Sequence, residues 1–408
     1  MRFIGKKYHF SSLQWVILIG LLLSRIGTSM MMPFFAIFLT NELGMSYTLA
    51  GFVTGVSFVS YLIGGLLGGV FSDRSGRKMI FNFSLFSYAM SFFMFAIAVK
   101  VLPLSNFLTF ILCTINLLAG LNRSCIDTLG QAILADLAMP AQKVALFSLR
   151  YTMANVGNGL GPLLGTVLGF NGTINGFYIA GGFCFIYFLL FLIYAGGHNI
   201  SGSNNSNDKQ KKDISLKKII LVLCQDRAMG LFILGGMVIT TVYSQLGSTL
   251  GLILMQRTGS TSLFAMLMTV NALTVVILQI PMTGYFLKRY SMLNTMRFGC
   301  LLIGIGLVGN AFSANKAYLY IASQIIFTMG EILIFPVNGM YVESLAPVAL
   351  RGSYFGAMNL LQLGRAIGPI LGGFLLQYTS ANITLVAFAI IAVATTWIYN
   401  KGNQAIAK

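Results

Sequence analysis

Charged residues are scarce in this chain of 408 residues. Asp, Glu, Lys and Arg together make up 9% of it, whereas hydrophobic residues make up 57%. A soluble globular protein usually has about 25% charged residues and about 45–50% apolar ones. The composition therefore excludes a soluble globular protein and predicts one that crosses a membrane several times.

Histidine and cysteine are also rare. The two histidines, His9 and His198, lie outside the long apolar runs, so the sequence offers no basis for a histidine proton relay. The cysteines are scattered and show no metal-ligand spacing. We expect no metal and no cofactor, and free, buried thiols at all five positions: Cys113, Cys125, Cys184, Cys224 and Cys300.

Motifs for nucleotide chemistry and catalysis are missing too. No Gly-rich phosphate-binding loop of the Gly-x-x-x-x-Gly-Lys-Ser/Thr type occurs, which argues against direct use of ATP. The apolar runs contain no nucleophile–base pair, so a membrane-embedded enzyme or a scaffold is the disfavoured class of function. The formal net charge of +17 comes from basic residues that lie mainly in the loops between apolar runs, so it does not indicate a nucleic-acid partner.

The chain does contain long apolar runs. A membrane-spanning helix needs about 20 mainly apolar residues. Cutting the sequence at its polar turns gives about twelve such spans, and the first is too long for a signal peptide and lacks a small-residue cleavage site. The expected spans are Leu13–Thr40, Tyr47–Phe71, Met79–Val99, Asn106–Leu134, Val144–Phe170, Gly176–Gly196, Ala228–Met255, Ser262–Leu287, Leu293–Ser313, Ala317–Ser344, Gly352–Tyr378 and Asn382–Tyr399.

A polar segment divides these spans into two halves. We predict an all-α fold with a six-helix bundle at 1–196, a cytoplasmic linker at 197–227 and a second six-helix bundle at 228–408. Asp136 and Pro140 recur as Glu343 and Pro347, at a single offset of 207 positions, which indicates an internal duplication. Basic residues concentrate in the linker and in alternate loops, so both termini are expected in the cytoplasm.

A charged turn joins the second and third spans. The stretch from Gly69 to Lys78 reads Gly-Val-Phe-Ser-Asp-Arg-Ser-Gly-Arg-Lys. This pattern resembles the loop between the second and third helices of the major facilitator superfamily of secondary transporters. Because a carboxylate can accept bonds from a helix N-terminus, we expect Asp73, with Arg74, Gly76 and Arg77, to act as a conformational latch.

The fifth span carries a run rich in glycine, which contains Gly157, Gly161, Pro162 and Gly165. Small residues let helices approach closely, and a Gly-Pro pair can bend a helix. The run resembles the antiporter motif of proton-coupled drug exporters in the superfamily. The resemblance favours export over import, although ordinary helix packing is the alternative reading.

Five charged residues lie inside the apolar spans, where charge is costly and often functional. Asp127 and Glu331 are the expected proton carriers. Arg123 and Asp127 are four residues apart and can pair on one helix face, and the family pattern also has an arginine in this span. Any basic partner of Glu331 must come from another span, and Arg25 and Arg365 are the candidates. Structural ion pairs are the alternative for all five.

Two further expectations concern charges near span ends. We expect Arg150 to lie near the membrane surface as an anchor or as a member of a loop network, and Asp136 to cap its helix or pair with Lys143. Among uncharged polar residues, Tyr243 and Gln245 resemble a seventh-helix segment of drug-exporter-like members, and Asn271 is a further candidate. The predicted substrate-binding residues are thus Arg25, Arg123, Tyr243, Gln245, Asn271 and Arg365.

The resemblance covers nearly the whole chain and implies a twelve-helix, proton-coupled antiporter that exports a small amphiphilic molecule or drug by alternating access. It implies a bacterial inner-membrane protein that acts as a monomer on a small molecule and protons. One alternative keeps the fold but moves an anionic solute, such as a carboxylate siderophore, an organic acid or a lipid headgroup, by export or import. The excess of buried arginines over buried acids motivates that alternative.

Overall fold

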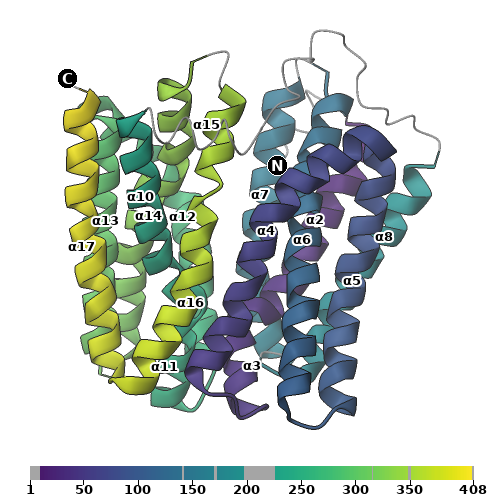
Figure 1. Cartoon of the computed structure of the whole chain (residues 1–408), viewed down its shortest axis with the longest axis horizontal. Helices are drawn as coiled ribbons and strands as arrows, with labels where there is room; N and C mark the ends of the chain where they lie inside the picture. Colours follow the sequence, from purple (N-terminus) through teal and green to yellow (C-terminus); the bar gives the residue numbers. More distant parts are fainter. Residues whose placement is uncertain are drawn as a thin grey trace. The chain divides into compact units, whose positions relative to one another are not determined.

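The computed structural model describes residues 10–139, 142–169, 172–196, 226–314, 316–347 and 351–406; within them it leaves out the side chains of 66–75, 143–145, 148, 351–353, 403, 405 and 406. Every element in these residues is a helix (Figure 1). Eleven of the helical segments are long and apolar enough to span a membrane. The helix α7 (Lys143–Val167) is not among the eleven, but it coincides with the expected fifth span.

The described residues divide into two compact units. Among the described residues, the first unit contains 10–44 and 56–196, and the second contains Met45–Gly55 and the residues from 226 onward. The predicted all-α membrane fold is confirmed. Most of the predicted linker lies outside the described residues.

In the first unit, the opening span is interrupted where Pro33 occurs, because proline cannot donate a backbone hydrogen bond. It consists of α2 (Ser12–Met31), the 3₁₀ turn η1 (Met32–Phe34) and α3 (Phe35–Asn41). Next come α4 (Tyr47–Ser75), α5 (Arg77–Val101), α6 (Asn106–Leu137), α7 and α8 (Ile174–Tyr194). The helix α2 packs on α7 and α8, and α5 packs on α6 and α8.

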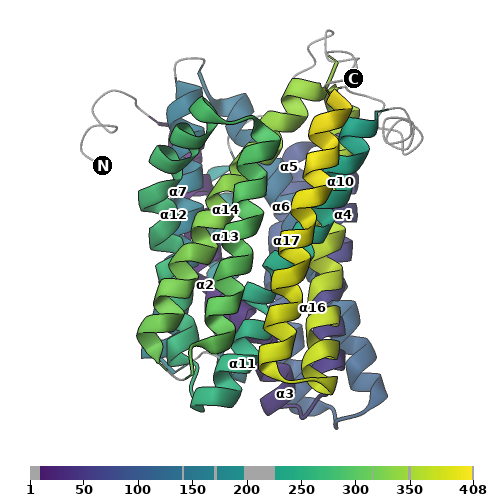
Figure 2. The same cartoon turned by 90° about the vertical axis from the view of Figure 1, so that its left-hand side faces the viewer.

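In the second unit, two spans are interrupted. One is built from α10 (Arg227–Tyr243), η4 (Ser244–Gly247) and α11 (Thr249–Thr258), and the other from α15 (Arg351–Met358) and α16 (Leu361–Tyr378). The continuous helices are α12 (Ser262–Arg289), α13 (Met292–Phe312), α14 (Ala317–Leu345) and α17 (Ala381–Ile406). Figure 2 shows α13 between α14 and α17, which are its main packing partners.

The first part of α4 belongs with the second unit because it packs closely on α16. A Cβ atom at Gly51 would overlap the backbone of Pro369, and one at Gly55 would overlap the backbone of Ala366. Beside these glycines, the Thr48 hydroxyl donates to Gln377 Oε1 at 2.7 Å. Glycine at both positions therefore permits a backbone approach that any side chain would prevent.

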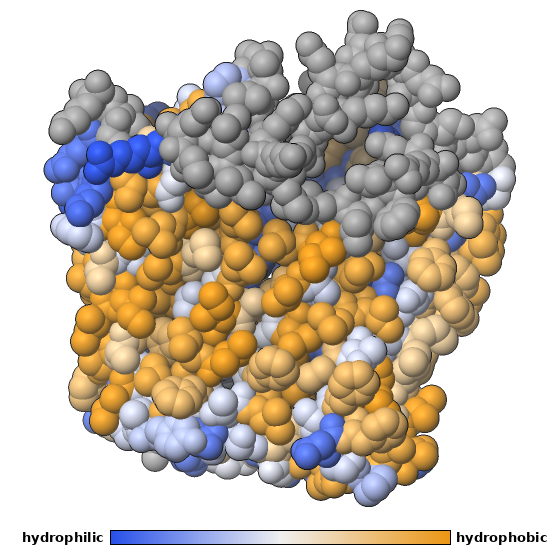
Figure 3. All heavy atoms as spheres, in the orientation of Figure 1, coloured by the Kyte–Doolittle hydropathy of each residue, from blue (hydrophilic) through white to orange (hydrophobic). Residues whose placement is uncertain are grey.

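The outward faces of the helices are apolar. Exposed large hydrophobic side chains include Phe110 of α6, Ile280 of α12 and Ile390 of α17. On the face drawn in Figure 3, hydrophobic residues cover the middle of the helices, and hydrophilic residues lie toward their ends. This distribution suits helices that are surrounded by lipid along their middle. The four described cysteines are free, with Cys113 half-buried and the other three buried.

Candidate functional site

The buried acid of the first unit is Asp127, which lies in the middle of α6. Arg25 of α2 donates to its Oδ1 at 2.5 Å, and the Tyr61 hydroxyl of α4 donates to its Oδ2 at 3.1 Å. Arg150 of α7 lies 3.9 Å from Oδ1 and donates to the backbone carbonyl of Asp127 at 3.3 Å. Groups from three other helices therefore converge on this one carboxylate.

These contacts differ from two of the sequence expectations. No ion pair among the described residues includes Arg123; the ion-pair partners of Asp127 are Arg25 and Arg150, which lie on other helices. An ion pair between residues four apart on a helix contributes only about 0.2–0.5 kcal/mol, so arginines from packed neighbours can replace it. Arg150 is not a surface anchor, because its guanidinium points to Asp127.

The cluster of Arg25, Tyr61, Asp127 and Arg150 carries an excess of positive charge. Two guanidinium groups face one carboxylate, and Arg123 lies one helical turn away on α6. The side chains of Arg25, Asp127 and Arg150 are 16%, 14% and 17% exposed, so the cluster is mostly buried but not sealed. A negatively charged group could enter and compete with Asp127 for these donors.

The glycine run of α7 determines how closely α2 approaches this cluster. A Cβ atom at Gly157 would lie 2.6 Å from Cβ of Arg25, and one at Gly161 would meet the backbone of α2. Ser29 of α2 also donates to the Gly157 carbonyl at 3.0 Å. Pro162 lies within α7, which continues through it to Val167. The run thus holds α2, and Arg25 with it, against α7.

The buried acid of the second unit is Glu331, on α14. The Tyr243 hydroxyl of α10 donates to its Oε1 at 3.0 Å, and Asn271 Nδ2 of α12 donates to its Oε2 at 2.6 Å. No ion pair among the described residues includes Glu331. Two neutral donors, Tyr243 and Asn271, which the sequence predicts as cargo-binding residues, bind this carboxylate instead of a basic partner.

Arg365 of α16 lies close to Glu331 but rests on aromatic rings. Its guanidinium carbon is 5.4 Å from the ring centroid of Tyr243 and 5.6 Å from that of Phe335. The two rings are 4.6 Å apart and meet edge to face. Arginine over an aromatic face is a cation–π arrangement. Glu331, Tyr243, Phe335 and Arg365 therefore form a site with one acid and an aromatic wall.

Gln245 has a different environment from the other predicted binding residues. Its side chain is fully buried, and its Nε2 donates to the carbonyl of Gly368 at 2.9 Å, while the Thr249 hydroxyl donates to its Oε1. Glycine at 368 and 372 leaves room for this amide. Gln245 joins η4 to α16, and we do not include it in the proposed binding site.

The charged turn is very short. Gly76 alone separates α4 from α5, and its φ of +89° is a conformation that favours glycine. Arg77, the first residue of α5, forms an ion pair with Asp136 of α6. We expect Asp136 to cap its helix or to pair with Lys143; its ion-pair partner among the described residues is Arg77, and the side chain of Lys143 lies outside those that the structure describes. The side chains of Asp73 and Arg74 lie outside those that the structure describes.

The two acids occupy similar places in their own units. Each lies on the fourth span of its unit, and each accepts a bond from the first span and one from the second. The sequence offered no signal for Tyr61, which is one tyrosine among 17. The repeat therefore extends from the backbone to the arrangement of donors, although the donors are cationic in one unit and neutral in the other.

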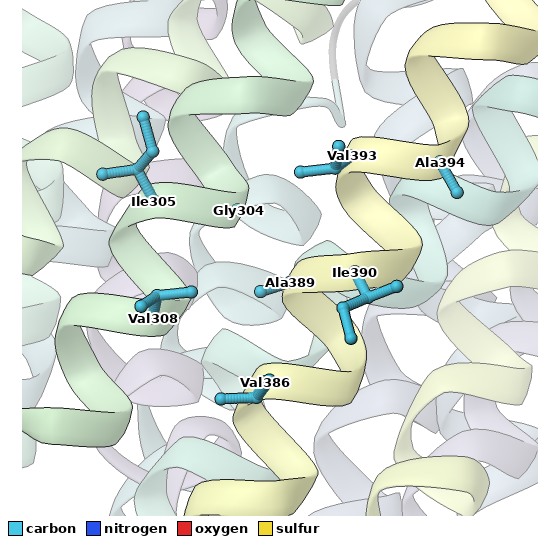
Figure 4. Close-up of a pocket in the computed structure, with 8 residues that line it drawn as sticks. All are labelled: Gly304, Ile305, Val308, Val386, Ala389, Ile390, Val393 and Ala394. Carbon is cyan, nitrogen blue, oxygen red and sulfur yellow. The ribbon is translucent and has the colours of Figure 1, made fainter.

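A pocket of about 510 Å³ lies between α13 and α17 (Figure 4). It is lined by small and aliphatic residues, among them Gly304, Ile305, Val308 and Val393, and the polar clusters take no part in it. Such a lining offers no side-chain donor or acceptor to orient a polar molecule. We therefore do not assign the chemistry of this protein to it.

Sequence comparison links the chain to transporters. A family model described as the Major Facilitator Superfamily matches residues 17–364. The chain is 30% identical over 387 residues to the uncharacterized MFS-type transporter YqjV of Bacillus subtilis, covering 94% of this chain and 91% of that protein. It is 26% identical over 370 residues to a Na(+), Li(+), K(+)/H(+) antiporter of Planococcus maritimus, covering 84% of each.

More distant relatives extend this pattern. The chain is 23% identical over 378 residues to the multidrug resistance protein MdtH of Aeromonas salmonicida, covering 90% of this chain and 89% of that protein. Among solved structures, the nucleoside transporter NupG is similar with a TM-score of 0.79 and 16% identity, covering 96% of this chain and 99% of that one. At that identity the likeness shows the fold alone.

Proposed function

Because this chain belongs to the major facilitator superfamily, we propose that it is a proton-coupled exporter of small amphiphilic molecules. The family membership makes it a multi-pass membrane transporter of a small molecule. Coupling to protons, the direction of transport and the class of cargo are the proposed parts. The relatives named as a multidrug resistance protein and as an antiporter support them.

The observation that carries the proposal is the environment of Glu331. Its carboxylate is bound by Tyr243 and Asn271, which are neutral donors, at 3.0 and 2.6 Å. Glu331 can therefore take up or lose a proton without breaking an ion pair. A proton on Asp127, by contrast, would compete with Arg25 at 2.5 Å. We assign the proton exchange first to Glu331 and a secondary role to Asp127.

The aromatic wall beside Glu331 supports an amphiphilic cargo. Arg365 is a planar cation that rests on Tyr243 and Phe335. An organic cation with an apolar body could make the same contacts, because aromatic faces attract cations. When Glu331 is charged, it favours such a cargo; when it carries a proton, that attraction is lost. Exchange of cargo for a proton follows from this competition.

We place the protein in a bacterial inner membrane, as a monomer with both termini in the cytoplasm. In the proposed cycle, the duplicated halves give alternate access to the site from the two sides. The turn with Asp73, Arg74, Gly76 and Arg77 would control the rate of that change. The contact between Gly157 and Arg25 would let the glycine run influence the first unit's cluster.

Inverted membrane vesicles test the proposal, with the fluorescent cation ethidium as the probe. An acid interior should drive ethidium accumulation by the wild-type protein. Glu331→Gln should abolish this accumulation, because the neutral amide can neither release a proton nor attract the cation. The matched control is Glu343→Gln, an exposed acid on the same helix, which should behave as the wild type. Proton-driven accumulation by Glu331→Gln would refute the proposed role.

A second candidate function is transport of an anionic solute, and the first unit's cluster favours it. Arg25 and Arg150 both face Asp127, and Arg123 takes part in no ion pair among the described residues, so positive charge is in excess there. The anionic dye fluorescein distinguishes the two candidates in the same vesicles. Movement of fluorescein but not ethidium, with loss of that movement in Arg150→Gln, would replace the first candidate by the second.

A further inference from the structure

The pocket between α13 and α17 is an apolar groove in the surface of the second unit. Gly304 and Ala389 are buried at its floor, where a Cβ atom at Gly304 would lie 3.2 Å from the Ala389 carbonyl oxygen and 3.1 Å from Val393 Cγ2. Ile305 and Ile390 lie at its edges and are 55% and 64% exposed. Figure 4 shows the lining side chains on the two helices. Both helices are long and apolar enough to span a membrane, so the groove opens toward lipid.

The helix faces that line the groove continue beyond it to two cations. Arg297 of α13 lies seven positions before Gly304, and Lys401 of α17 lies seven positions after Ala394. Residues seven apart are separated by about two helical turns and share one face. Each cation therefore lies on the groove side of its own helix.

The two cations lie at the same end of the groove. The start of α13 meets the end of α17, since a Cβ atom at Gly402 would lie 3.3 Å from Leu293 Cδ1. Arg297 donates to Asn294 Oδ1 at 2.9 Å, so its guanidinium extends toward the start of α13. In the part of the chain that the structure describes, neither Arg297 nor Lys401 takes part in an ion pair. Both positive charges can therefore interact with an anionic group at this end.

Trp397 lies between the groove and Lys401 along α17. Its side chain is 62% exposed, and Lys401 Nζ lies 3.6 Å from the centroid of its ring. Tryptophan is enriched where hydrocarbon meets headgroups. Lys401 is twelve positions after Ala389, which is about 18 Å along a helix, and half of the hydrocarbon core is about 15 Å thick. With Lys401 at the level of the headgroups, the groove lies in the hydrocarbon.

We propose that this groove binds an anionic phospholipid such as phosphatidylglycerol, with an acyl chain along the groove and the phosphate at Arg297 and Lys401. Lipid chains are as apolar as the side chains that line the groove, so preference for one lipid must come from its headgroup. Basic residues between the ends of membrane-spanning helices bind anionic headgroups. Two cations without a carboxylate partner therefore favour phosphatidylglycerol over a lipid of zero net charge.

A second copy of this chain is a poorer occupant of the groove. Two copies in one membrane that are related by a two-fold axis bring the same ends of the same helices together. Arg297 and Lys401 of one copy would then approach the same two cations of the other, and like charges repel. A lipid phosphate supplies negative charge at this place instead. The charges therefore favour a lipid.

Lipid binding to the purified, delipidated full-length protein tests the site. The probes are phosphatidylglycerol and phosphatidylcholine with the same acyl chains, and native mass spectrometry measures the bound fraction of each. Phosphatidylglycerol should bind at least about tenfold more tightly, because each basic residue near the headgroups contributes about a fivefold preference. Lys401→Gln should weaken phosphatidylglycerol binding by about fivefold, and Arg297→Gln with Lys401→Gln by about 25-fold.

The matched control is Arg289→Gln. Arg289 is an exposed cation over an aromatic ring, as Lys401 is, because its guanidinium carbon lies 4.4 Å from the centroid of the Tyr285 ring. It is at the end of α12, on the same side of the membrane as the start of α13, but it does not line the groove. This variant should change the affinity for phosphatidylglycerol by less than about twofold.

A phosphatidylglycerol with a photoreactive group on its acyl chain locates the bound chain. In the wild type, cross-links should form on the lining residues of α13 and α17. Ala394 is an exposed lining residue, so Ala394→Phe fills the groove from its open side without disturbing the packed floor. This variant should lose the cross-links while its thermal unfolding in detergent stays as in the wild type.

Three results would overturn the lipid site. The first is equal affinity for the two lipids, or equal losses in Lys401→Gln and Arg289→Gln. The second is cross-linking that avoids α13 and α17. The third is formation of disulfide-linked dimers by Ala394→Cys in native membranes, which would assign the groove to a second copy. None of these measurements involves protons or ethidium, so the lipid site and the proposed function can fail separately.

Discussion

At the scale of single residues, the two buried acids are held by different kinds of partner. Asp127 lies between the guanidinium groups of Arg25 and Arg150, whereas Glu331 accepts bonds from a phenol and an amide. Removing one charge from a buried ion pair leaves the other uncompensated, which is strongly destabilising. The two acids should therefore contribute unequally to stability.

We expect Asp127→Asn to lower the free energy of unfolding by about 2–4 kcal/mol and Glu331→Gln by less than about 1 kcal/mol. The first change leaves two arginines without their carboxylate, and the second leaves an oxygen that can still accept from Tyr243. Thermal unfolding in detergent measures both. A double variant, Arg25→Met with Asp127→Leu, should recover part of the loss; equal losses in the two single variants would contradict the argument.

The sequence could identify these acids but not their partners. Charge inside an apolar run is visible in the sequence, and both Asp127 and Glu331 were selected on that basis. The partner of Asp127 is 102 positions away in the chain. Which residues form ion pairs depends on the side of each helix that faces its neighbours. The four-residue spacing of Arg123 and Asp127 suggested a local ion pair, and the place of Arg150 near a span end suggested a surface residue. Neither feature predicted the ion pairs that Asp127 forms with Arg25 and Arg150.

At the scale of helices, the packing of α2 on α7 controls the position of Arg25. Gly157 faces the Cβ atom of Arg25 and the backbone of α2, so there is no flexible side chain that can move aside. Interiors are packed densely, and an added methyl group forces the neighbouring backbone to shift. The glycine run therefore has a structural role in addition to any role in antiport.

Gly157→Ala should destabilise the protein by about 1–3 kcal/mol and reduce transport, because α2 must move away from α7. Gly182→Ala on α8 is the matched control, since a Cβ atom there would meet nothing within 4 Å. In a helix, this control substitution should be neutral or slightly stabilising. Thermal unfolding and ethidium transport of both variants provide the measurement. Similar behaviour of the two alanine variants would disprove the packing argument.

At the scale of the whole molecule, the duplication was the most informative sequence feature. The recurrence of Asp136 and Pro140 as Glu343 and Pro347 predicted two related bundles, and the all-α membrane fold is confirmed. The sequence did not indicate that Met45–Gly55 associates with the second unit. That association depends on glycines of α4 meeting the backbone of α16, which only tertiary structure reveals.

Cysteine labelling tests the predicted topology. Leu104 lies in the loop between α5 and α6, and Tyr290 in the turn between α12 and α13; both are exposed. A membrane-impermeant maleimide should label Leu104→Cys in intact cells and Tyr290→Cys only in opened cells. Native background should be low, because three of the four described cysteines are buried. The reverse pattern would invert the assignment of the termini.

The contrast between the two carboxylates also has an electrical consequence. While Asp127 stays with its arginines, the first cluster keeps a constant charge. Protonation of Glu331 changes the charge of the second unit by one elementary unit. Moving one elementary charge across the whole membrane against a voltage of about 100 mV changes its free energy by about 2.3 kcal/mol. The potential of the cell should thus act on the step that loads or empties Glu331, and scarcely on the arginine cluster.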